Sequence, residues 1–263
     1  MLRIKKNRLK IVFILTLVLF QFTSCQYNRS NDLKVAGAAN MQIALLEIAD
    51  IFEMETGIHV SLISGSSGKL TAQILEGAPF DIFVSADAFY PQKIVEAEKN
   101  IALPKVYAYG NLIILSLNPE IPASLSSLNS ERVHHIAISN PKSAPYGRAA
   151  EQALKFHRLY DDISSKLVFG ESVAQTNQFL ISKAAQIALT AKSTIYSFDG
   201  NVYYDFIEID KKSYKKIEQS AILIKNNNGN ETDAKKFYLF LFSDKAQSIL
   251  TKYGYDVPGK ILK

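Results

Sequence analysis

From residue 33 onward, short apolar segments alternate with longer segments of helical periodicity. Residues 33–38 (LKVAGA) predict a buried strand, and residues 41–55 carry apolar side chains at the spacing of one helix face. Gly57 is placed to end that helix as a C-terminal cap. A strand at 58–64, a short helix and a strand at 80–86 follow. This β-α-β-α-β order predicts a parallel sheet with helices on its faces.

The same alternation returns between residues 133 and 191, where three strands enclose two helices. A strand-like segment at 110–118 lies between the two blocks, and another at 220–228 follows the second block. A long helix is expected after it, at 233–254. The sequence shows no repeat at a fixed period. The pattern predicts an α/β protein with two Rossmann-like α/β lobes joined by a two-strand hinge, with the C-terminal helix returning to the first lobe.

The first 25 residues differ from the rest in composition. Five basic residues precede an apolar run at 11–20, which is the layout of a secretory signal. The run is shorter than the about 20 residues that a membrane-spanning helix needs. Cys25, the single cysteine, follows in a context (FTSCQ) that resembles a bacterial lipobox, although Phe22 stands where leucine is usual. Simple secretion and a membrane anchor remain alternatives.

We therefore expect residues 1–25 to be a lipoprotein signal peptide, with Cys25 lipidated, and residues 26–32 to be a polar tether to the membrane. The first lobe is expected to comprise residues 33–112 and 222–263, and the second lobe residues 113–221.

The charge of the chain bears on one question, whether the protein binds nucleic acid. The net charge of +5 comes from the leader, which holds five of the 30 basic residues and none of the 25 acidic ones. The remainder is neutral overall, so no nucleic-acid partner is predicted.

Three connections rich in small residues each open a predicted helix after a strand: 37–42 (GAANMQ), 64–69 (SGSSGK) and 140–148 (NPKSAPYGR). Ligands of such sheets bind beyond the carboxyl ends of the strands, where free N–H groups and the helix dipole favour an anion. Ordinary capping is the alternative for any one loop. The second loop is no nucleotide loop, because Ile63 replaces the required glycine and Leu70 follows Lys69 where Ser or Thr is needed.

Other chemistry is weakly indicated. His134 and His135 are adjacent, so on a strand they would point to opposite faces, and no metal site is predicted. Asp81 and Asp87 flank one strand and are interpreted as caps rather than as a catalytic pair. No Gly-x-Ser-x-Gly elbow is present, and no enzyme activity is predicted.

Three segments carry a family resemblance: VAGAANMQIAL, SGSSGKLTAQILEGAPFDIFVSAD and SNPKSAPYGRAAEQAL. They resemble the periplasmic molybdate-binding proteins of ABC transporters, and the resemblance extends over about residues 33–257. It implies a type II periplasmic binding protein fold, an oxyanion cleft between the lobes and no cofactor. The ligand would be molybdate or tungstate, the partners the permease subunits of an ABC transporter, and the location the periplasm or cell surface. We expect a monomer.

The resemblance also implies the ligand-binding residues. Side-chain donors fall on Asn40 and Ser67, and backbone N–H donors on Tyr146 and Val173. Some members add a tyrosine hydroxyl where this chain has Ala191, and Tyr146 is a candidate replacement. Direct roles for Lys69 and Arg148 stay open.

Three rival functions remain at this stage. The first is a receptor for another oxyanion such as sulfate or phosphate. The second is a secreted hydrolase that uses Ser67 as its nucleophile with a histidine. The third is a structural lipoprotein without a ligand.

Overall fold

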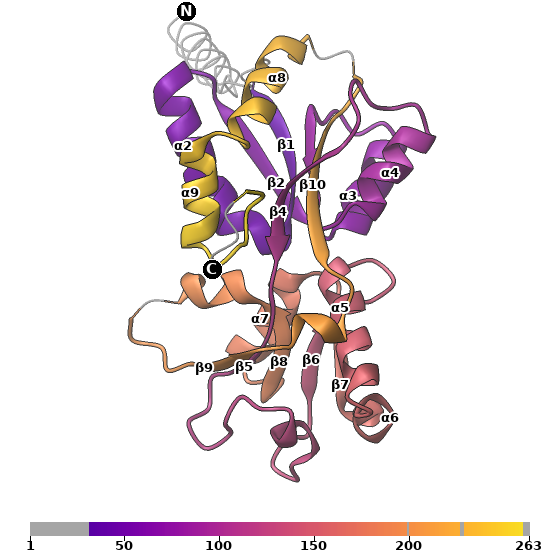
Figure 1. The fold of residues 1–263 in the computed structure, drawn as a ribbon, viewed down its shortest axis with the longest axis vertical. Coiled ribbons are helices and arrows are strands. Elements are labelled where there is room, and N and C mark those ends of the chain that lie inside the picture. Colours follow the sequence, from indigo (N-terminus) through magenta and orange to yellow (C-terminus); the bar gives the residue numbers. More distant parts are fainter. Residues whose placement is uncertain (1–31, 199, 227–228, 260–263) are drawn as a thin grey trace, which may run out of the picture. The chain divides into compact units, whose positions relative to one another are not determined.

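Two five-stranded mixed sheets, each covered by helices on both faces, form the framework of the protein (Figure 1). The structure is a computed structural model that describes residues 32–198, 200–226 and 229–259. We call each sheet with its helices a lobe. Both lobes belong to a single unit that begins at Leu33.

The first lobe is built on the sheet β2-β1-β3-β10-β4. β1 pairs in parallel with β2 and β3, whereas β10 runs antiparallel to β3 and β4. Its strands are β1 (Leu33–Ala38), β2 (Val60–Gly65), β3 (Ile82–Val84), β4 (Lys105–Gly110) and β10 (Ile217–Leu223).

The second lobe repeats this arrangement with the sheet β7-β6-β8-β5-β9. β6 pairs in parallel with β7 and β8, and β5 runs antiparallel to β8 and β9. Its strands are β5 (Leu112–Ser116), β6 (Ile136–Ser139), β7 (Leu167–Gly170), β8 (Ile187–Ala191) and β9 (Asp205–Glu208).

Both faces of the first sheet are buried under helices. Successive strand residues point to opposite faces, so Val35 joins one apolar cluster and its neighbour Ala36 joins the other. The first cluster packs against α2 (Gln42–Thr56), α8 (Glu231–Phe240) and α9 (Asp244–Lys252), and the second against α3 (Ser67–Leu75) and α4 (Phe89–Glu96).

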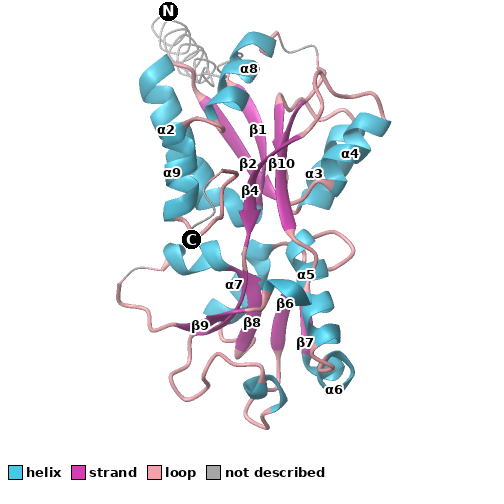
Figure 2. Ribbon diagram, in the orientation of Figure 1, coloured by secondary structure: helices cyan, strands magenta, loops and turns pink. Residues whose placement is uncertain are grey.

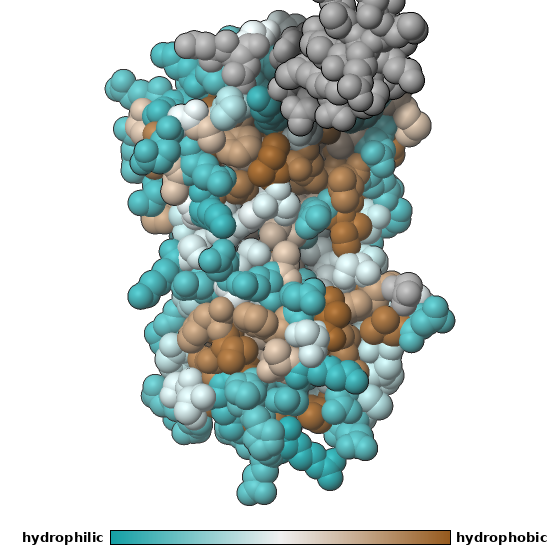
Figure 3. All heavy atoms as spheres, turned by 180° about the vertical axis from the view of Figure 1, so that it is seen from behind, coloured by the Kyte–Doolittle hydropathy of each residue, from teal (hydrophilic) through white to brown (hydrophobic). Residues whose placement is uncertain are grey.

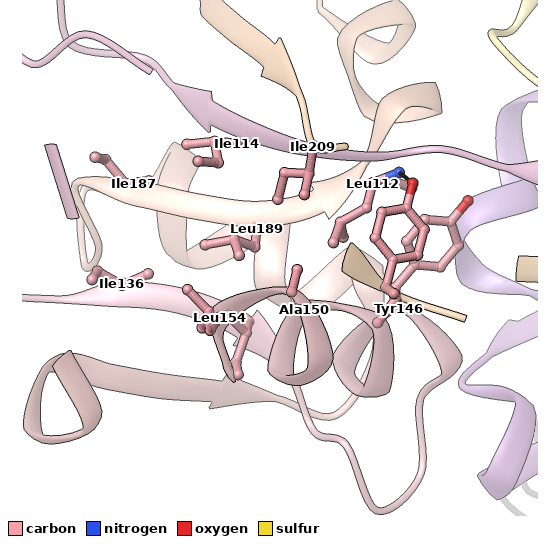
Figure 4. Packing of buried hydrophobic residues seen from close by; sticks show 14 of the residues in the cluster. Leu112, Ile114, Ile136, Tyr146, Ala150, Leu154, Ile187, Leu189 and Ile209 are labelled. Carbon is pink, nitrogen blue, oxygen red and sulfur yellow. Dashed lines mark hydrogen bonds between the residues drawn. The ribbon is translucent and has the colours of Figure 1, made fainter. Parts of the chain in front are cut away.

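The second sheet follows the same rule. Ile114 and Leu189 pack against α5 (Pro145–Phe156), as Figure 4 shows, whereas Ile113 and Ala188 face the side of α7 (Val173–Ile181). The short elements of the chain are α6 (Tyr160–Ile163) and the 3-10 turns η2 (Ala39–Met41), η3 (Ser126–Asn129), η4 (Ser164–Lys166), η5 (Lys192–Ser197) and η6 (Lys211–Ser213).

Most of the predicted elements are confirmed, and Gly57 ends α2 with φ +70° as expected (Figure 2). The single long helix predicted at 233–254 is wrong. Ser243 interrupts it and caps α9 by accepting a hydrogen bond from the N–H of Ala246. The sequence patterns also gave no sign of α4, β4 and β9.

The chain crosses between the sheets at two places, after β4 and before β10. Gly110 ends β4 in the first sheet and Leu112 begins β5 in the second, so the crossing lies at Asn111. The expected second boundary, at 221/222, falls within β10, all of which pairs in the first sheet.

The expected signal peptide, Cys25 and most of the tether lie outside the described residues. Within the described part of the chain, no helix is long and apolar enough to cross a membrane. Figure 3 shows hydrophilic side chains over much of one face, with separate apolar patches between them.

Candidate functional site

A small cavity lies where loops from both lobes meet. The loops follow β1 and β2 in the first lobe and β6 and β7 in the second. Asn40, Ser67, Tyr146 and Val173, the four residues expected to bind ligand, all line it. The other lining residues are Ala38, Ala39, Gly65, Ser66, Ala86, Ala144 and Pro145. None of these described lining residues carries an acidic or basic side chain.

Ser67 supplies the hydroxyl of the site. It is the first residue of α3, which Ser66 caps by accepting a hydrogen bond from the N–H of Lys69. The Oγ of Ser67 accepts the backbone N–H of Ala86 at 3.0 Å, and the side chain is buried. Because the oxygen already serves as an acceptor, its own O–H remains to be donated to a ligand.

The second lobe contributes backbone N–H groups at two helix starts. Pro145 occupies the first turn of α5 with Tyr146 after it, and Ser172 caps α7 so that Val173 is its first residue. The first N–H groups of a helix have no intrahelical acceptor. Among the described residues, the N–H groups of Tyr146 and Val173 have no hydrogen-bond acceptor. Both are therefore open to an anion.

The electrostatics of the cavity come from helix dipoles. α3, α5 and α7 all begin at it, and none of the three has an acidic residue in its first turn. A helix N-terminus carries about half a positive charge. The cavity thus favours an anion without an ionised cation in its lining.

Asn40 anchors its loop to β10 and to the segment that follows α9. Its Nδ2 donates to Oε1 of Gln219 at 2.8 Å and to the hydroxyl of Tyr255 at 3.1 Å. Its carbonyl accepts from Tyr255 at 2.6 Å and, across the lobes, from Ser193 at 2.8 Å. Both amide hydrogens are therefore engaged with protein, and neither is left for the ligand to which the resemblance assigned this side chain. Burial raises the pKa of the Tyr255 hydroxyl to about 12.

The Tyr146 hydroxyl packs beside Gly110, where the chain leaves β4. A Cβ added at Gly110 would lie 2.2 Å from this oxygen and 3.1 Å from Nε2 of Gln219. Among the described residues the buried hydroxyl has no hydrogen-bond partner. Gly110 therefore has to be a glycine for the ring of Tyr146 to lie where it does.

Lys69 and Arg148 do not line the cavity and instead pair with acids across the lobes. Lys69 Nζ lies 3.5 Å from Oε2 of Glu171, and both side chains are largely exposed. Arg148 forms an ion pair with Asp87. Burial raises the pKa of Asp87, and this exceeds the opposing effects of the Tyr90 N–H and Arg148.

The interpretation of Asp81 and Asp87 as structural groups fits their hydrogen bonds. Asp81, which precedes β3, accepts a hydrogen bond from the N–H of Lys34. Asp87, which follows β3, accepts one from the N–H of Tyr90. Within the described ranges, no three metal-ligating side chains gather to hold a metal ion.

Residues 33–256 match the bacterial extracellular solute-binding proteins. The chain belongs to this family. It is similar to the molybdate-binding protein ModA of Rhodobacter capsulatus, with 36% identity over 84% of this chain and 86% of that protein. A periplasmic molybdate-binding protein of Azotobacter vinelandii has a similar solved structure, with a TM-score of 0.80, 32% identity and coverage of 86% and 100% of the two chains. The predicted periplasmic binding protein fold is confirmed.

A more distant relative is a putative ABC transporter substrate-binding lipoprotein of Bacillus subtilis, YvgL, with 27% identity over 93% of this chain and 96% of that protein.

Sequence reasoning missed the two residues that hold the Asn40 side chain in place by hydrogen bonds. Gln219 lies on β10 and Tyr255 follows α9, both far from Asn40 in sequence. No local motif marks either residue, because their role depends on the return of the C-terminal segment to the first lobe.

Proposed function

We propose that this protein is an extracytoplasmic receptor that captures molybdate or tungstate between its lobes and delivers it to the permease of an ABC transporter. The observation that carries the proposal is a cavity lined by loops of both lobes and without charged side chains, on which the hydroxyl of Ser67 and the N–H groups of Tyr146 and Val173 converge. Asn40, Ser67, Tyr146 and Val173 are its proposed ligand-binding residues.

The donor set suits a fully ionised oxyanion. A hydrogen bond to a charged group contributes about 1.5–3 kcal/mol, so a handful of them supports tight binding without a countercharge. Phosphate that retains a proton needs an acceptor, and no carboxylate is among the described residues of the lining. Asp87, the nearby acid, is already paired with Arg148.

A hydrolase is disfavoured by the surroundings of Ser67. Its Oγ accepts from the N–H of Ala86, and no histidine is among the described residues that line its cavity. Without a base to take its proton, a serine hydroxyl is a weak nucleophile.

Calorimetric titration with molybdate, tungstate, sulfate and phosphate tests the proposal. We expect one site per chain, with molybdate and tungstate bound at least a hundredfold more tightly than sulfate and phosphate. Equal or tighter binding of sulfate would assign the site to another oxyanion. The absence of heat and of a thermal shift with all four would refute an oxyanion receptor.

Lipidation of Cys25 forms a separate part of the proposal. The cysteine follows a secretory signal, and the Bacillus subtilis relative is described as a lipoprotein. A diacylglycerol on Cys25 would hold the monomeric receptor at the membrane that carries its permease. Metabolic labelling with palmitate should mark the protein and fail to mark a Cys25→Ser variant; an unlabelled wild type would contradict the anchor.

A further inference from the structure

A second set of contacts joins the two lobes beside the cavity. It involves Gly68, Asp87 and Tyr90 of the first lobe and a loop and helix of the second, represented by Lys142, Ser143 and Arg148. We call this set the clasp. Its bonds connect protein to protein, so none of them uses an anion as a partner.

The centre of the clasp is a backbone hydrogen bond. The N–H of Gly68 donates to the carbonyl of Ser143 at 3.0 Å. Gly68 directly follows Ser67, and Ser143 precedes the stretch from Ala144 to Tyr146 that lines the cavity. The bond therefore joins the loops that carry donors from opposite lobes.

Gly68 permits this approach because it has no side chain. A Cβ at this position would lie 2.8 Å from the carbonyl oxygen of Ser143 and 2.8 Å from the hydroxyl of Tyr90. Gly68 stands in the first turn of α3, and its lack of a side chain is what lets the loops of the two lobes lie this close.

Arg148 and Tyr90 extend the clasp outward. The Tyr90 hydroxyl donates to the carbonyl of Lys142 at 3.2 Å and accepts from Nη1 of Arg148 at 3.3 Å. The guanidinium pairs with Asp87 and lies 5.1 Å and 5.4 Å from the ring centres of Tyr90 and Phe89. Both charged side chains are partly sheltered, with 31% and 15% of their surface exposed, so solvent screens the pair less than a surface pair.

We propose that the clasp holds the two lobes at the separation an oxyanion requires, and that Gly68 and Arg148 are positioning residues for binding. The inference rests on the proposed function, since it concerns the same cavity. A receptor that is partly closed before its ligand arrives binds more tightly, because the apparent Kd is the intrinsic Kd divided by the competent fraction.

Gly68→Ala tests the centre of the clasp. The matched control is Gly200→Ala, where an added Cβ meets no atom within 4 Å. The distance between the lobes is measured without ligand by spin labels at Met54→Cys and Phe156→Cys, both exposed positions, in a Cys25→Ser background. We expect Gly68→Ala to lengthen this distance, weaken molybdate binding at least tenfold and accelerate dissociation, and Gly200→Ala to change none of these.

Two further variants separate the clasp from local damage. Tyr90→Phe alone removes the hydroxyl that a Cβ at Gly68 would meet within the first lobe, together with its bonds to Lys142 and Arg148. Any further opening when Gly68→Ala is added to Tyr90→Phe therefore comes from the clash with Ser143. Arg148→Lys should keep part of the closure that Arg148→Gln loses. An unchanged distance between the lobes, together with an affinity within twofold of wild type, in Gly68→Ala would overturn the clasp. If the wild type binds no oxyanion, the proposed function fails, while the ligand-free distances still decide the clasp.

Discussion

The two lobes are topological copies that supply their donors in different ways. In each sheet the second strand of the order, β1 or β6, is followed by a site residue, Asn40 or Tyr146. The edge strand, β2 or β7, is followed by the other, Ser67 or Val173. Equivalent strand ends therefore meet at one cavity, although the sequence has no repeat.

The difference lies in the kind of donor. The first lobe offers the hydroxyl of Ser67, fixed by the N–H of Ala86, and a loop anchored through the Asn40 amide. The second lobe offers the backbone N–H groups of Tyr146 and Val173 at helix starts. In the proposed site, the strand–helix junctions of the second lobe supply backbone N–H groups, and a side chain of the first lobe adds the hydroxyl. The lobes should accordingly respond differently to substitution.

The largest effect should come from removing one donor of each kind. Ser67→Ala deletes the hydroxyl, and Val173→Pro deletes an N–H at a first helical position, where proline is well tolerated. Each should cost about 1.5–3 kcal/mol of binding, or tenfold and more in Kd. The double variant should lose about 3–6 kcal/mol if the lobes contribute independently. Titration with molybdate measures all three.

Control measurements distinguish the loss of a hydrogen-bond donor from the loss of side-chain packing. Val173→Ala keeps the N–H and should bind almost as the wild type does. Ser67→Ala should also lower the free energy of unfolding by about 1–3 kcal/mol, because the buried N–H of Ala86 loses its acceptor. Wild-type affinity in Val173→Pro would show that the N–H of Val173 does not bind the anion.

The next effect concerns alkaline pH and should originate mainly in the first lobe. The unfolded chain has a tyrosine pKa of about 10, whereas folding raises that of Tyr255 to about 12. The folded state therefore holds its proton more tightly. This contribution to stability, about 3 kcal/mol, is complete below pH 10 and is lost as the pH rises towards 12.

Denaturant titrations between pH 8 and pH 12 measure this loss. Burial also raises the pKa of Tyr107 and Tyr146, so Tyr255→Phe should reduce the alkaline loss without abolishing it. An identical pH profile in Tyr255→Phe would show that this hydroxyl does not contribute.

The smallest effect should come from the exposed ion pair between the lobes. Lys69 and Glu171 expose 60% and 73% of their side chains. Exposed pairs contribute about 0.2–1 kcal/mol and are screened by salt. Lys69→Ala should therefore weaken molybdate binding less than about fivefold. A hundredfold loss would mean that Lys69 contacts the anion.

Sequence reasoning predicted the parts of this protein that depend on local patterning. β1, α2 and the first-turn residues of α3, α5 and α7 follow from apolar periodicity, capping serines and Pro145. These signals lie within a few residues of the structures they specify. The four expected site residues line one cavity for this reason, since three of them stand at or near a helix start. Their role as ligands stays a prediction.

What sequence reasoning could not supply depends on contacts between distant segments. The break at Ser243 was hidden because both halves, α8 and α9, keep apolar side chains against the same core. The Asn40–Gln219–Tyr255 network and the contact of Gly68 with Ser143 join residues that no local pattern relates. The destination of Arg148, paired with Asp87 rather than with a ligand, required the positions of both lobes.

The crossing strands have a consequence for the order in which the chain can assemble. The second lobe's sheet is complete once residue 208 has emerged, whereas the first lobe's sheet lacks β10 until residue 223 and its covering helices α8 and α9 until residue 252. β10 is the strand that lies between β3 and β4 in the sheet. Before β10 is present, β3 pairs only with β1 and β4 has no strand to pair with. During translation or export the later-starting lobe can therefore fold first, and the earlier-starting lobe must wait with open strand edges until nearly the whole polypeptide is present.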